Sequence, residues 1–159
     1  MIDVIFAIKL VHLLASGVMV GTWLCVAVFM VLAHRSGNTA VVALTSQFVV
    51  RAEFTAMAPA LALQPISGFP LAYAIGLDPL GEFWIDVALV IYAGIVICWI
   101  AALRIEIRIR GMTRQAALDA VPLPAGYRPL FRVWCLLAGA LLAAMIAVYA
   151  LMIWQPRLD

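Results

Sequence analysis

The protein has 159 residues, of which 67% are hydrophobic and 11% charged, and its mean hydropathy is +1.14. A soluble domain of ordinary composition carries about a quarter charged residues, so this composition predicts a single domain, 1–159, whose solvent is a lipid bilayer. The net charge is only +2, and no basic stretch is interleaved with aromatic residues. These features exclude nucleic acid as a partner.

Four apolar runs are long enough to be transmembrane helices, which need about 20 residues to cross a hydrocarbon core of roughly 30 Å. They cover about 4–33, 56–76, 84–103 and 133–154. The sequence therefore predicts an all-α fold, a four-helix transmembrane bundle with antiparallel neighbours. The first run follows Asp3 instead of a basic stretch and is longer than the apolar core of a signal peptide. We expect it to be retained as a helix.

Arginine residues concentrate in two of the three predicted connections. The connections 34–55 and 104–132 hold most of them, the turn 77–83 holds none, and the tail holds only Arg157. By the positive-inside rule, 34–55 and 104–132 are cytoplasmic loops and both termini are outside. Residues 39–55 are expected to extend the second helix out of the membrane. The predicted location is the bacterial inner (cytoplasmic) membrane, crossed several times, with the bilayer as the first partner.

Ionisable residues inside the apolar runs are the first functional candidates, because placing them in hydrocarbon is costly. Lys9 and Asp86 lie near the outer helix ends, where they can reach the headgroups or pair with each other. His12 lies roughly 12 Å into the first helix, too deep to reach water. It therefore needs a hydrogen-bond partner, a cavity or a metal. We see no paired transmembrane carboxylates that would suggest a proton relay.

Several polar, aromatic and thioether residues share the depth of His12. Counting about eight residues inward from each outer helix end brings six positions to this level: Gln64, Ser67, Gly68, Tyr92, Met145 and Tyr149. These positions predict a pocket in the outer half of the bundle. Because core histidine and methionine side chains serve as haem ligands, His12 is a candidate ligand of haem iron. The alternative is a structural histidine bonded to Gln64, Ser67 or Tyr92.

Other residues are assigned structural roles. His34 lies about 33 Å from His12 along the helix, too far to share one haem, and is predicted to be a solvated loop residue. Gly17 and Gly21 are spaced to allow close approach of another helix. The three cysteines follow no ligand spacing and are interpreted as small buried hydrophobic residues: Cys25, Cys98 and Cys135.

A family resemblance rests on short motifs in the first two predicted helices. They are Lys9-Leu10-Val11-His12, Gly21-Thr22-Trp23, Arg51, and Met57-Ala58-Pro59-Ala60 followed by Gly68. On these residues the chain resembles the predicted integral membrane proteins grouped as domain of unknown function 2269. That family is similar to the copper-resistance D membrane proteins and to the four-helix membrane protoporphyrinogen oxidase. In the oxidase relatives the equivalent histidine and lysine are linked to haem binding and activity, which implies that role for His12 and Lys9.

Three functions remain open. The leading hypothesis is a protein that binds one b-type haem, or a similar tetrapyrrole, through His12 for quinone-linked electron transfer or oxidation. Its partners would be a quinone or a redox protein, and a homo-oligomer is compatible with it. The second is a non-enzymatic accessory or assembly subunit with a structural His12. The third is metal or small-solute transport, favoured only by the copper-resistance relatives, since no Met-x-x-Met or Cys/His ligand set is present.

Overall fold

The computed structural model describes residues 2–156, which contain helices and no strand. In chain order the elements are α1 (Ile2–Ser36), α2 (Thr39–Ala52), η1 (Glu53–Met57), α3 (Ala58–Ala74), α4 (Phe83–Leu118) and α5 (Tyr127–Trp154). Because α2, η1 and α3 follow one another without a break, they form one long helix. The described chain thus has four helices that are long and apolar enough to cross a membrane. The predicted all-α, four-helix membrane fold is confirmed.

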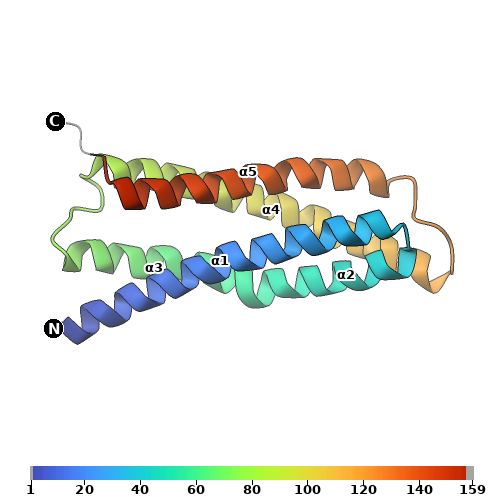
Figure 1. The fold of residues 1–159 in the computed structure, drawn as a ribbon, viewed down its shortest axis with the longest axis horizontal. Helices are drawn as coiled ribbons and strands as arrows, with labels where there is room; N and C mark the ends of the chain where they lie inside the picture. Colours follow the sequence, from blue (N-terminus) through green and yellow to red (C-terminus); the bar gives the residue numbers. More distant parts are fainter. Residues whose placement is uncertain (1, 157–159) are drawn as a thin grey trace.

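Sequential helices of the bundle run in opposite directions (Figure 1). The start of α1, the end of α5 and the α3–α4 turn lie at one end of the bundle, and the other two connections lie at the opposite end. Both ends of the described chain therefore share one end of the bundle, as an even number of crossings requires. The side of the membrane that each end faces remains a prediction, and Arg157 lies outside the described residues.

The predicted loops 34–55 and 104–132 are mostly helical. Residues 39–55 extend the second helix, as expected, whereas α4 and α5 extend well beyond their predicted boundaries. Only Gly37 and Asn38 separate α1 from α2. Gly37 has a positive φ of 64°, and the Asn38 side chain accepts hydrogen bonds from the first amides of α2. At the other connection α4 continues through its arginine-rich stretch to Leu118. Charged residues end an apolar run without ending a helix, because arginine, glutamate and glutamine are good helix formers.

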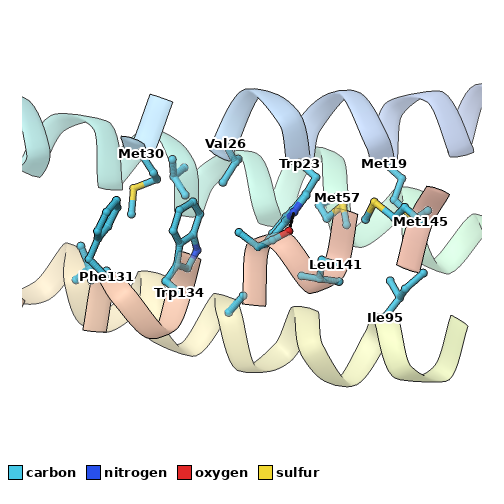
Figure 2. Close-up of a cluster of buried hydrophobic side chains, with 14 of the residues drawn as sticks. Met19, Trp23, Val26, Met30, Met57, Ile95, Phe131, Trp134, Leu141 and Met145 are labelled. Atoms are coloured by element: carbon cyan, nitrogen blue, oxygen red, sulfur yellow. Dashed lines mark hydrogen bonds between the residues drawn. The ribbon is translucent and has the colours of Figure 1, made fainter. Parts of the chain in front are cut away.

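The core is a row of aromatic and thioether side chains along the bundle axis (Figure 2). Near its middle, the Trp23 indole donates a hydrogen bond to the Ala138 carbonyl at 3.2 Å. Towards the α1–α2 connection, Trp134 and Phe131 extend the row. His34 stacks on Phe131 with ring centroids 4.0 Å apart. The predicted solvated loop position for His34 is therefore wrong, because α1 continues to Ser36 and carries His34 against α5.

The small residues on one face of α1 do not form the predicted helix contact. A Cβ built at Gly17 or Gly21 would meet nothing within 4 Å. Cys25, one turn further on, is exposed as well, so the prediction that it is buried is also wrong. Cys98 and Cys135 are partly buried. The buried face of α1 is instead the stripe that contains Met19 and Trp23, and residues two positions away from this stripe point outwards.

The second long helix changes its packing partner at η1. Before η1, α2 packs along α4, whereas after it α3 packs mainly on α1. The element η1 is a π-helix, and its widened turn closes with a bond from the Ala58 amide to the Glu53 carbonyl. Pro59 accounts for the irregularity, since it has no amide hydrogen for the Thr55 carbonyl and its ring clashes with that carbonyl in an α-helix. Once α3 no longer follows α4, space remains between α3 and the α4–α5 pair.

Candidate functional site

That space is a cavity of about 450 Å³ lined by α1, α3, α4, α5 and the α3–α4 turn. Most of its wall is apolar. The core residues Met19, Ile95 and Met145, on the right in Figure 2, are part of its lining and mark where the cavity meets the core. Pro79, in the α3–α4 turn, lies at the opposite end. The cavity therefore occupies the half of the bundle that contains the two chain ends.

His12 lies in the wall of this cavity and is held by a directed chain of hydrogen bonds. Its Nδ1 lies 2.9 Å from the Ser67 hydroxyl oxygen. The Ser67 hydroxyl itself donates to the Leu63 carbonyl at 2.5 Å. Because a hydroxyl has only one proton to donate, we assign the proton of the first bond to Nδ1 of His12. The imidazole then keeps its lone pair on Nε2, the nitrogen available to a ligand.

The surface of α3 is shaped to receive the imidazole. A Cβ at Gly68 would lie only 3.2 Å from Cε1 of His12, so the absence of a side chain lets the ring lie close to the helix. One turn earlier, the Gln64 side-chain amide donates to the His12 carbonyl at 3.3 Å. Gln64, Ser67 and Gly68 together hold the backbone and the ring of His12. Of the three structural partners considered for the ring from sequence, Ser67 is the one observed.

Tyr92 of α4 serves a different part of the wall. Its hydroxyl donates to the Leu61 carbonyl at 2.5 Å. Pro65, four residues after Leu61, has no amide hydrogen, so this carbonyl has no partner within the α-helix. The tyrosine satisfies the backbone group that the proline leaves free. It also connects α4 to α3 across the space that separates them.

The structure brings the sequence-predicted residues together. Of the eight residues predicted for the site, Ser67 does not line the cavity but is hydrogen-bonded to the His12 ring. The other seven line the cavity: Lys9, His12, Gln64, Gly68, Tyr92, Met145 and Tyr149. Lys9 is on the exposed side of α1 yet reaches the cavity, and Met145 is fully buried at its inner end. The depth count therefore places these residues around one volume, while their role in binding a cofactor stays a prediction.

Two functional candidates are absent from the sequence-based set. Glu53, in η1, and Glu106, in α4, are fully buried, although the sequence places both in cytoplasmic loops. The expectation of no paired transmembrane carboxylates concerns the four apolar runs, and both glutamates lie just beyond these runs. A signal was present in the spacing: Ser46 and Glu53 are seven residues apart, as are Glu106 and Thr113. Polar residues two helical turns apart lie on one face of a helix, and two such faces can pair.

The family of the chain follows from comparison with known proteins. The family described as "Predicted integral membrane protein (DUF2269)" matches residues 6–156. The chain belongs to this family. No curated protein and no solved structure matches the chain. The match covers every residue of the cavity wall, so the cavity lies within the part of the chain that defines this family of integral membrane proteins.

Proposed function

We propose that this DUF2269 protein binds one b-type haem, or a similar tetrapyrrole, in the cavity, where Nε2 of His12 would hold the iron. The observation that carries the proposal is the fixed orientation of His12. Histidines that ligate metals almost always donate their other ring N–H to an oxygen atom, and the Nδ1 of His12 has such a partner in Ser67. An apolar wall with one oriented imidazole is a suitable chemical environment for a porphyrin.

The other residues of the cavity fit this ligand. Its volume of about 450 Å³ is within the usual range for small-molecule sites. The ammonium group of Lys9 would pair with a propionate, and the thioethers of Met19 and Met145 would either complete the coordination of the iron or pack against the ring. A bound haem would supply one-electron redox chemistry. The chain would bind it, orient the ligand through Ser67 and exclude water, in a role linked to quinone oxidation or reduction.

The absorbance spectrum of detergent-purified protein from haem-replete cells tests the proposal. We expect a Soret band in the wild type and its loss in His12→Ala with insertion unchanged. His34→Ala is the matched control, because it removes the only other histidine at the opposite end of α1 and should leave the band intact. Ser67→Ala should weaken haem retention by about 10- to 100-fold, as expected for a residue that orients a ligand.

A specific observation also favours a second function, that of a non-enzymatic accessory or assembly subunit. The hydrogen bond between His12 and Ser67 joins α1 to α3, so the pair also suffices as a structural contact. Wild-type protein from haem-replete cells that shows no Soret band would contradict the haem proposal and leave this one. Metal transport gains no support from donor geometry, since no three His, Cys, Asp or Glu side chains among residues 2–156 converge on one point.

A further inference from the structure

The buried glutamates Glu53 and Glu106 face each other across the contact between the second long helix and α4. The register of this antiparallel contact is given by Ser46 and Thr113, whose hydroxyl oxygens lie 3.2 Å apart. Moving about two turns along the second helix from Ser46 leads to Glu53. Moving two turns back along α4 from Thr113 leads to Glu106, so the pairing of the hydroxyls places the two carboxyl groups at the same level.

Each carboxyl group has one hydrogen-bond partner and one oxygen without any. The indole of Trp99 donates to Oε2 of Glu53, and the indole of Trp134 donates to Oε1 of Glu106 at 2.8 Å. The remaining oxygens, Oε1 of Glu53 and Oε2 of Glu106, are buried and have no partner. Both side chains have an exposed fraction of 0%. Two unpartnered acceptors are therefore enclosed in one buried contact.

Among residues 2–156, no basic side chain balances the pair. The arginines of the helices around it lie on exposed or half-exposed faces, as the burial of Arg51, Arg104, Arg108, Arg110, Arg128 and Arg132 shows. His34, on α1, is bonded to Tyr127. The side chains of Cys98 and Cys135 pack against the core. An unpaired carboxylate in such surroundings is strongly disfavoured, and two neighbouring carboxylates cannot easily both be ionised.

From this geometry we infer that Glu53 and Glu106 form a proton-binding site that retains at least one exchangeable proton at neutral pH. A proton on one carboxyl group supplies the donor that the two unpartnered oxygens lack. The indoles of Trp99 and Trp134 stabilise the charge that remains. Glu53 begins the π-helix, an irregularity that is frequent at functional sites. The inference does not rest on haem binding, because the glutamates do not line the cavity.

Infrared spectroscopy of the purified full-length protein in lipid vesicles tests the site. We expect the C=O stretch of a protonated carboxylic acid at neutral pH, with a shift to lower frequency in D₂O. The band should disappear in the double variant Glu53→Gln plus Glu106→Gln, since glutamine preserves the shape of a neutral carboxyl group. Glu82→Gln is the control: it changes the only other glutamate, in the α3–α4 turn, and should preserve the band.

Four results would overturn the inference. Three of them are a wild type without the acid band, a band that D₂O leaves unchanged, and a band that persists in the double variant. A fourth is a band that disappears when sodium replaces a large organic cation at constant pH, because the site would then hold a metal ion. Should the double variant fail to fold, the wild-type spectra in H₂O and D₂O, with and without sodium, still decide whether an exchangeable acid proton is present.

Discussion

The backbone and the ring of His12 are held by different residues of α3. Gln64 donates to the His12 carbonyl, and Ser67 bonds to Nδ1 of the ring. Both contacts come from one face of α3, with Gly68 leaving room for the imidazole. At the residue scale, His12 therefore lies in a recess on α3 formed by Gln64, Ser67 and Gly68. Substitutions at Gly68 and at Ser67 test how closely the histidine fits this recess.

Adding one methyl group to the recess should displace the histidine. In Gly68→Ala the new Cβ would lie 3.2 Å from Cε1 of His12, closer than an ordinary contact, so the ring must move. We expect a loss of about 1–3 kcal/mol in the free energy of unfolding, measured by equilibrium unfolding in mixed detergent. Gly94→Ala is the control, because nothing lies within 4 Å of a Cβ there; equal losses in the two variants would contradict the recess.

Removing the Ser67 hydroxyl should leave Nδ1 of His12 without a partner. For Ser67→Ala we expect a loss of about 1–3 kcal/mol, the cost of a buried polar group that loses its hydrogen bond. Ser16→Ala removes another hydroxyl next to the cavity, one that donates only to the Leu13 carbonyl of its own helix. In the same unfolding measurement, Ser67→Ala should lose clearly more unfolding free energy than Ser16→Ala. Similar losses would show that the His12–Ser67 bond contributes little.

The sequence is informative about this recess and misleading about the glutamates, for a physical reason. Depth along a helix follows from counting residues, so the count alone places His12, Gln64 and Ser67 at one level. Apolar runs alone do not show where a helix ends in a charged stretch, so the sequence places Glu106 in a loop and Glu53 in a helical extension outside the membrane, with nothing to bring the two together. The orientation of the His12 ring was equally beyond the sequence, because it depends on a serine hydroxyl directed to Leu63.

At the scale of the elements, prolines in the second long helix create backbone acceptors that other helices satisfy. Pro65 frees the Leu61 carbonyl, and the Tyr92 hydroxyl bonds to it. Tyr92→Phe should cost about 1–3 kcal/mol in the wild type and much less in Pro65→Ala, where the alanine N–H can take over the carbonyl. A double-mutant cycle measures this coupling.

Tyr73→Phe is the control for that cycle, because Tyr73 is largely exposed. It should cost little in either background. Additive effects of Tyr92→Phe and Pro65→Ala would mean that the tyrosine does not replace the missing amide of the proline.

The π-helix sets the rotation of α3 relative to α2. Deleting Thr55 removes one residue from η1, while Pro59 still has no amide hydrogen to close an ordinary α-helical turn. We therefore expect α3 to lose its present rotation relative to α2, so that Ser67 no longer faces α1. We expect a marked fall in the apparent melting temperature in detergent. Deleting Ala125 from the α4–α5 loop shortens the chain equally without rotating a helix, and should be tolerated far better. An unchanged melting temperature for the Thr55 deletion would show that the π-helix does not position α3.

At the scale of the whole molecule, the four crossings and the arginine distribution predict the orientation. A reporter fused after Pro124, in the α4–α5 loop, should read as cytoplasmic, and one fused after Asp159 as periplasmic. A single crossing, α5, separates the two points. Reporters that read the same compartment would contradict the four-crossing topology, and reversed readings would contradict the orientation alone.

The length of α4 also determines how the protein can adapt to its membrane. Its 36 residues extend about 54 Å at 1.5 Å per residue, well beyond a hydrocarbon core of roughly 30 Å. The part of α4 beyond the hydrocarbon core carries arginines, whose long side chains can extend to the headgroups when this part of the helix moves into the bilayer. More of the bundle can thus lie within a thicker bilayer and less within a thinner one. Hydrophobic mismatch should therefore alter how deeply the protein is inserted and leave its internal packing intact.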